Sequence, residues 1–131
     1  MSRPCPCTSK ATYDRCCEPF LTGQRLPETA EKLMRSRFSA YALGRADYLA
    51  ATTCAEERAK LDVEELARYC KAVRCISLRI LSTEAGGQGD QAGIVLFHAK
   101  LLINGKRMLH REKSRFIRED GKWAYVDGET N

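Results

Sequence analysis

The spacing of apolar residues along the chain changes once, just past its middle. From Thr29 to Gly44, apolar side chains recur at steps of three and four residues, which predicts an amphipathic helix capped by Thr29 and ended by Gly44. A shorter helix is expected from Ala46 towards Thr53. A third is expected to begin at Asp62, whose carboxylate can cap the first turn, and to bury Val63, Leu66, Ala67, Cys70 and Val73.

After Cys75 the period falls to two, as in strands that have one buried face. The dipeptides Asn104-Gly105 and Asp120-Gly121 tolerate the positive φ angles of two-residue hairpin turns. Helices followed by an antiparallel meander predict an α+β fold, with the helices covering one face of a bent sheet. The expected strands are 75–83, 92–103, 106–118 and 122–127.

Residues 1–27 follow neither period and contain four of the seven cysteines, in the pattern C-x-C-x8-C-C. A segment so poor in apolar residues needs an external constraint to hold a shape. Four thiolates around one ion form a closed tetrahedral site, which favours structural zinc, with iron as the alternative ion. A redox pair or incidental surface cysteines is the competing interpretation. The four expected ligands are Cys5, Cys7, Cys16 and Cys17.

A second candidate site is centred on Arg37, in the middle of the apolar face of the first predicted helix. A buried unpaired guanidinium is costly, so a carboxylate partner is expected inside the domain. If Asn104-Gly105 closes a hairpin, Phe97 lies opposite Glu112, which puts Glu112 on the inward face. The expected inward-facing polar set is Arg37, His110, Glu112, Ser114, Tyr125 and Asp127.

This polar set has two interpretations. It could form a ligand pocket or an active site, in which a histidine and a carboxylate act as acid and base. The preferred interpretation is a structural ion-pair network that locks the helix to the sheet. The chain has neither the spacing of a catalytic triad nor that of a phosphate-binding loop, so the sequence assigns no reaction.

Length and charge narrow the class of protein. A chain of 131 residues with 44% apolar residues is expected to form one domain with a real core. The net charge of +5 permits contact with nucleic acid, anionic lipid or an acidic protein without requiring any of them. A basic stripe on the third strand is interpreted as a solvated face, with adhesion to an acidic partner or RNA as the alternative. The stripe consists of Arg107, Arg111, Lys113 and Arg115.

Neither a leader-like segment nor a run of about 18 apolar residues is present, so no membrane span is expected. We therefore expect a cytoplasmic protein whose cysteines stay reduced.

Several separated motifs carry a resemblance to known bacterial families. The stretch CPCTSK (5–10) with YDRCC (13–17) is similar to the SEC-C motif, the zinc-binding module of the SecA translocation ATPase. That family usually carries Gly-Ser-Gly where this chain has Thr8-Ser9-Lys10. The stretches LMRSRFSAY (33–41), EKSRF (112–116) and GKWAYVDG (121–128) resemble the YchJ family.

The resemblance implies a SEC-C knuckle over residues 1–27, joined over residues 28–131 to a nuclear-transport-factor-2-like (NTF2-like) domain. That domain is a cone of helices against a strongly curved antiparallel sheet. In SecA the module is associated with the export chaperone SecB and with contacts to lipid and ribosome. A zinc-binding adaptor linked to export or translation is therefore expected rather than an enzyme. Small-molecule binding or catalysis in the cavity of the sheet is the alternative.

Overall fold

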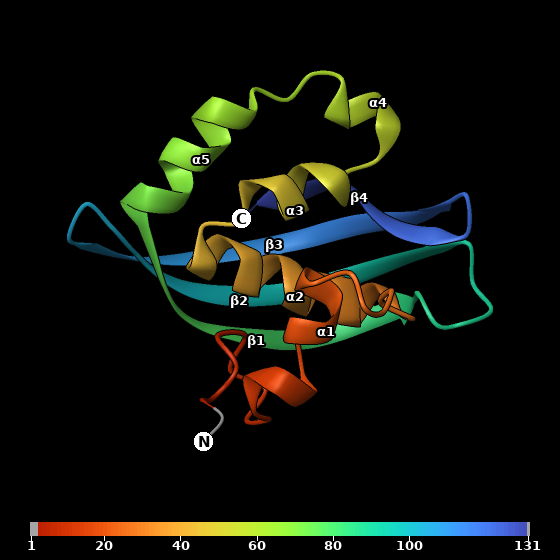
Figure 1. Cartoon of the computed structure of the whole chain (residues 1–131), viewed down its shortest axis with the longest axis horizontal. Helices are drawn as coiled ribbons and strands as arrows, with labels where there is room; N and C mark the ends of the chain where they lie inside the picture. The colour runs from red at the N-terminus through yellow and green to blue at the C-terminus, as the bar shows by residue number, and fades with distance from the viewer. Residues whose placement is uncertain (1–2, 131) are drawn as a thin grey trace.

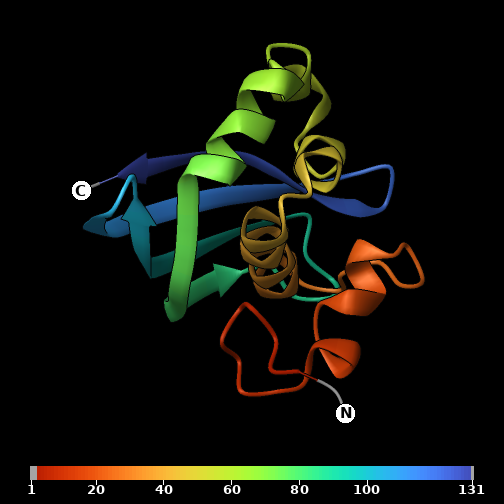
Figure 2. The same ribbon diagram turned by 60° about the vertical axis from the view of Figure 1, so that its left-hand side comes forward.

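Four antiparallel strands form one sheet in the order β1-β2-β3-β4, so each strand pairs with its neighbour in the chain. The computed structural model describes residues 3–130. The sheet is curved, and the helices gather on one side of it (Figures 1 and 2). The predicted α+β fold is thus confirmed. The strands are β1 (Val73–Ala85), β2 (Ala92–Ile103), β3 (Lys106–Glu119) and β4 (Lys122–Thr130).

The helices all precede the sheet in the chain, as expected. The hydroxyl of Thr29 accepts a hydrogen bond from Lys32 N at 3.1 Å, and Gly44 ends the same helix with φ of 72°. Asp62 caps the last helix by accepting from the backbone of Glu64 and Glu65. The helical elements are a 3₁₀ turn (Tyr13–Arg15), α1 (Glu18–Leu21), α2 (Ala30–Leu43), α3 (Ala46–Ala51), α4 (Ala55–Arg58) and α5 (Val63–Ala72).

The hairpin turns set the register of the sheet. Asn104 and Gly105 have φ of 51° and 82°, as a type I′ turn requires. Strand β2 therefore pairs with β3 in the predicted register, with Phe97 opposite Glu112 and Ala99 opposite His110. This register brings the polar residues of β3 to the face that α2 covers.

Helix α2 supplies the centre of the core. Leu33 and Phe38 are buried against the sheet, where Val95 and Phe116 are also buried. Two serines on α2 are fully buried as well, and one of them, Ser36, bonds the carbonyl of Leu33. The sheet and α2 thus form the two main layers of the domain.

Helix α5 departs from the sequence prediction in its packing. Val63 was expected in the core but is 46% exposed, and Cys70 is the one buried residue of the helix. The helix lies across one end of the sheet, beside α2 and α3 (Figure 2). Its attachment is at its C-terminal end, where the ring of Tyr69 meets Tyr41 edge-on at 5.9 Å.

Close backbone contact fixes the start of α2 against the turn between β1 and β2. The Ala30 amide donates to Gly86 O at 2.9 Å. A Cβ on Gly93 would lie 2.5 Å from the Gly86 Cα, and a Cβ on Gly86 would lie 2.9 Å from Ala30 Cβ. Only glycine therefore fits at either position.

We predict that Gly93→Ala destabilises the fold by about 1–3 kcal/mol, the range typical of overpacking, because the methyl group meets backbone that cannot move aside. Gly89→Ala is the matched control, since a Cβ there would meet nothing within 4 Å. Denaturant unfolding of both variants measures the difference. Equal stability of the two variants would show that the turn yields to the methyl group.

Candidate metal centre and interior pocket

The four predicted cysteine ligands converge in the structure. The Sγ atoms of Cys5, Cys7, Cys16 and Cys17 all lie within 4.8 Å of one another. The Sγ of Cys16 is 3.6 Å from that of Cys7 and 3.9 Å from that of Cys17. Tetrahedral zinc with Zn–S bonds of about 2.3 Å needs sulfurs about 3.8 Å apart, whereas a disulfide needs about 2.0 Å. The donor set and its spacing therefore fit a metal ion.

Burial isolates this cluster from solvent on most sides. Cys5, Cys7 and Cys17 are buried, and Cys16 is partly exposed. Hydrogen bonds from Cys17 and Cys5 lower the pKa of Cys7, while burial raises the pKa of Cys16 to about 11. Because metal ligation requires thiolates, a bound cation would favour the deprotonated form of all four.

Residues outside the cysteine motif complete the surroundings of the cluster. The Ser9 hydroxyl lies 3.1 Å from Cys16 Sγ, and the Ser39 hydroxyl lies 3.5 Å from Cys5 Sγ. Arg35 approaches from α2, with Nη1 3.4 Å from Cys7 O and 4.0 Å from Cys7 Sγ. Neither Arg35 nor Ser39 was identified from the sequence as a neighbour of the cluster.

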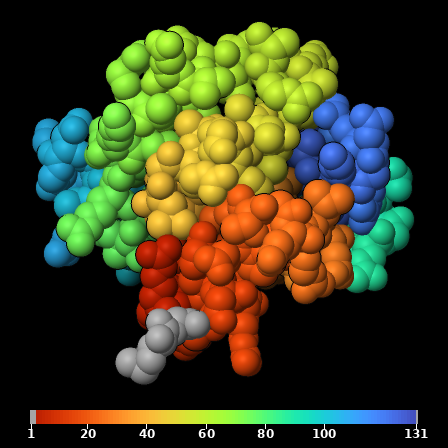
Figure 3. Space-filling view, in the orientation of Figure 1, coloured from red at the N-terminus to blue at the C-terminus, as the bar shows by residue number. Residues whose placement is uncertain are grey.

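The loop between the cysteine pairs is held against the sheet. Thr8 and Lys10 have φ of 59° and 78°, a region that glycine occupies at lower cost than other residues. The Thr8 hydroxyl donates to Leu78 O at 3.1 Å and accepts from Leu78 N at 3.0 Å. These bonds offset the strain and tie the loop to edge strand β1. In the space-filling view the N-terminal segment lies directly against the helical layer (Figure 3).

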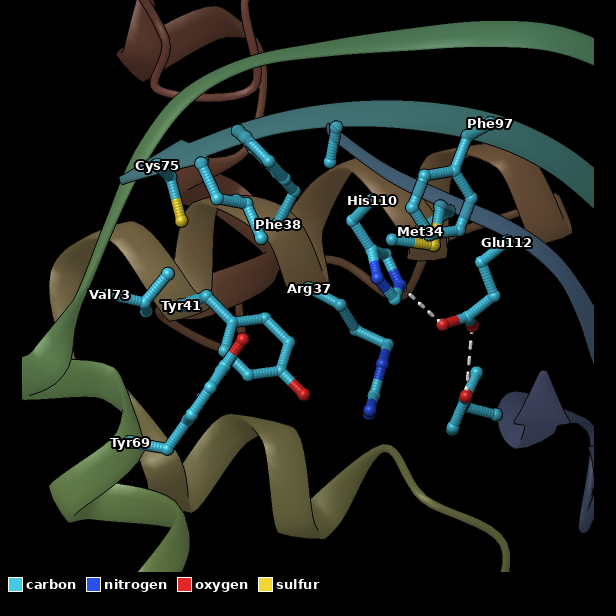
Figure 4. A pocket seen from close by; sticks show the side chains of 13 residues that line it. Met34, Arg37, Phe38, Tyr41, Tyr69, Val73, Cys75, Phe97, His110 and Glu112 are labelled. Atoms are coloured by element: carbon cyan, nitrogen blue, oxygen red, sulfur yellow. Dashed lines mark hydrogen bonds and ion pairs between the residues drawn. The ribbon is translucent and has the colours of Figure 1, made fainter. Parts of the chain in front are cut away.

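The second candidate site is a cavity between the sheet, α2 and α5. It has a volume of about 250 Å³ and is lined mainly by apolar and aromatic side chains. Arg37, His110 and Glu112, all from the predicted polar set, lie in its wall (Figure 4). Tyr125 also lines the cavity. The apolar wall includes Met34, Phe38, Tyr41, Tyr69, Val73, Cys75, Phe97, Ala99 and Leu101.

Three side chains donate to the carboxylate of Glu112. His110 Nε2 lies 2.8 Å from Oε1, and the Tyr125 hydroxyl donates to Oε2 at 3.0 Å. The hydroxyl of Ser114, which is fully buried, also donates to Oε2. A side chain at Gly128 would collide with this carboxylate, so the glycine opposite Ser114 leaves the space that Glu112 occupies.

These contacts change the titration of the pair. Burial alone would raise the pKa of Glu112, but the hydrogen bonds from His110, Ser114 and Tyr125 lower it further than burial raises it. The hydrogen bond to Glu112 raises the pKa of His110. The stabilisation from protonated His110 is thus complete below the ordinary imidazole pKa and is lost as pH rises through the raised value.

Arg37 is buried as predicted, but it does not pair with a carboxylate. Its Nη1 donates to Leu49 O and Thr52 Oγ1, both at 2.8 Å, and to Thr53 Oγ1 at 3.4 Å. Its guanidinium also lies over the Tyr125 ring, 4.5 Å from the centroid. The expected ion pair is replaced by the C-terminal turn of α3, where helix carbonyls carry partial negative charge.

Asp127 does not belong to the interior cluster. A shift of register between Arg115 and Phe116 pairs Tyr125 with Phe116 but Asp127 with Arg115. The bulge turns Asp127 to the outer face, where its carboxylate accepts from Arg115 at 2.6 and 2.7 Å. The prediction assumed unbroken alternation along β4 and was wrong for this reason.

Comparisons with known proteins identify the family. Residues 29–128 match the family described as YchJ, middle NTF2-like domain. A UPF0225 protein of Chromobacterium violaceum is 43% identical over 126 residues, covering 95% of this chain and 90% of its own length. A UPF0225 protein of Geobacter sulfurreducens is 37% identical over 128 residues, covering 98% of this chain and 80% of its own.

Solved structures agree with this assignment. A SEC-C motif containing protein from Rhodopseudomonas palustris is 35% identical with a TM-score of 0.89, covering 98% of this chain and 99% of its own. One from Psychrobacter arcticus is 23% identical with a TM-score of 0.83, covering 98% of this chain and 83% of its own, and shows the shared fold. This chain shares its fold with these two SEC-C motif containing proteins. The chain belongs to the YchJ-like family.

No helix in the part of the chain from residue 3 to residue 130 combines the length and apolarity that a transmembrane span requires.

We predict that Glu112→Gln lowers the pKa of His110 towards the ordinary imidazole value of about 6.5, because the amide removes the negative charge that stabilises the imidazolium. NMR titration of the imidazole carbon-bound protons measures this pKa. Asp127→Asn is the control, since it removes a carboxylate that bonds Arg115 on the other face. An unchanged His110 pKa in Glu112→Gln would contradict the assigned hydrogen bond.

Proposed function

We propose that the four-cysteine cluster binds one zinc ion and that the knuckle it orders is an adaptor surface for a protein partner in the cytoplasm. The observation that carries the metal assignment is the convergence of four thiols, three of them buried, at the spacing of a tetrahedral site. Four cysteines leave no open coordination position, which is the arrangement of structural zinc sites, and the same tetrahedral sulfur set also suits iron, the alternative ion. Bound there, the ion would cross-link residues 5–7 to residues 16–17 and so order residues 3–27 as a unit.

The exposed side of the knuckle supports the adaptor role. Arg3, Lys10 and Arg15 are exposed there, while the cysteines face inward. A basic surface on a rigid support suits an acidic partner. The resemblance of the motif to that of SecA points to a partner in export or on the ribosome. No disulfide joins any of the cysteines within the described residues 3–130, as expected in a reducing compartment.

The metal assignment predicts that purified protein carries one equivalent of zinc by elemental analysis. The double change Cys16→Ser and Cys17→Ser should abolish metal binding and lower the melting temperature, because a structural ion stabilises only the folded state. Cys54→Ser is the control, since Cys54 is buried outside the cluster and precedes α4 at a position where serine is a good helix cap. Metal-free protein with an ordered amino end would overturn the assignment. One equivalent of iron in place of zinc would change the identity assigned to the ion.

The adaptor role predicts that charge reversal on the knuckle abolishes partner capture. The triple change Arg3→Glu, Lys10→Glu and Arg15→Glu should retain zinc but lose the proteins that wild type captures from cell extract. The triple change Arg107→Glu, Arg111→Glu and Lys113→Glu makes the same charge difference on the exposed face of β3 and should keep them. Equal capture by both variants would exclude the knuckle as the docking surface. So would retention of all partners after the cysteines are replaced.

The interior cavity favours a second function, the binding of a small molecule. Its volume of about 250 Å³ lies just below the range of about 300–1,000 Å³ typical of ligand pockets. Its wall is apolar with a few converging polar groups, which is the usual composition of such pockets. His110 is 37% exposed, so the cluster is open to solvent on one side.

A further inference from the structure

We propose that the interior cavity binds a small aromatic carboxylic acid, whose carboxylate pairs with Arg37 and whose ring packs among the aromatic side chains of the wall. The inference rests on the second function proposed above, and it adds the chemical class of the ligand. Arg37, which supplies the charge, comes from the middle of α2 and lies beside Tyr41 and Glu112 in the close view of the cavity (Figure 4).

The first step of the argument is the charge balance of Arg37. The side chain is 5% exposed, and the oxygens that accept its hydrogen bonds are a carbonyl and two hydroxyls, all neutral. Burial lowers the pKa of its guanidinium. Burying a cation without a paired anion has a high free-energy cost. Neutral dipoles offset only part of the cost of removing the positive charge from water. A ligand carboxylate would supply the missing anion.

The second step is access to the guanidinium. All the hydrogen bonds that Arg37 makes to protein come from Nη1. Within residues 3–130, every fully buried side-chain nitrogen or oxygen has a hydrogen-bond partner. The Nε and Nη2 groups make no hydrogen bond to the described part of the protein, so neither is fully buried, and the side chain that carries them lines the cavity. These two groups form the edge of a guanidinium that binds a carboxylate through two parallel hydrogen bonds.

The third step concerns Glu112, which would repel an anion if its charge were exposed. Its carboxylate is 13% exposed and accepts from His110, Ser114 and Tyr125. When His110 is protonated, the pair is neutral as a whole. The positive charge of Arg37 is then the net charge that remains in the cavity wall, and an anionic ligand would balance it.

The fourth step is the shape of the apolar part. Phe38, Phe97, Tyr41 and Tyr69 line the cavity together with Met34. Aromatic rings and a thioether favour an aromatic guest through edge-to-face and sulfur–ring contacts. The small volume limits the guest to a single ring with a short acid chain.

The test uses hydrocinnamate, with its amide and the corresponding alcohol as neutral probes of the same size. Full-length protein with its metal is titrated with each probe, and NMR shifts of cavity-lining residues give the dissociation constants. We expect hydrocinnamate to bind at least tenfold more tightly than the amide, and to shift the Nε and Nη signals of Arg37. Equal affinity of acid and amide would overturn the carboxylate inference and leave the pocket function standing. No shift from any of the three probes would refute both.

Two variants locate the binding. Arg37→Met should abolish the preference for the acid over the amide. Because Arg37 also ties α2 to α3, this variant could lose its fold, and Ala99→Leu then serves in its place. Ala99 is buried and lines the cavity, so the larger side chain fills the space without changing any charge. It should weaken all three probes at least tenfold, and undiminished binding of hydrocinnamate to Ala99→Leu would place the acid outside the cavity and overturn the proposal.

Discussion

The hydrogen bond from Ala30 N to Gly86 O, at 2.9 Å, holds the first turn of α2 against the sheet, and both candidate sites include residues of this helix. With that end fixed, successive residues of one helix serve different sites. Arg35 and Ser39 reach the cysteine cluster, whereas Arg37 reaches the cavity. A movement of α2 along the sheet would therefore disturb both sites together. The two close glycine contacts make such a movement costly.

Much of the fold could be predicted from the sequence because its signals are local. The Thr29 cap, the Gly44 stop and the Asn104-Gly105 turn each depend on a few neighbouring residues. Once that turn is fixed, alternation places Glu112 on the inner face without further assumptions. The cysteine cluster could be predicted as well. Four thiols within thirteen residues, in a segment that has no hydrophobic core of its own, indicate a metal site.

What could not be predicted depends on tertiary contacts between distant elements. The partner of Arg37 is the end of α3, whose carbonyl and hydroxyl oxygens carry no signature that distinguishes them in the sequence. The outward position of Asp127 follows from one bulge beside Phe116, and bulges have no strong sequence signal. Arg35 and Ser39 were missed because their neighbours in space, rather than in the chain, give them their role.

The two bonds of Thr8 to Leu78 have a consequence for self-association. Strand β1 is at the border of the sheet, where unpaired backbone groups can recruit a strand from another molecule. The Thr8 hydroxyl bonds the amide and the carbonyl of Leu78 in the middle of that edge strand. The amino-terminal loop therefore blocks pairing with another strand at this position. A protein that lost its ordered knuckle would then do more than lose a small module. It would expose a template for intermolecular β-pairing, and ion depletion would favour aggregation even while the remaining domain stays folded.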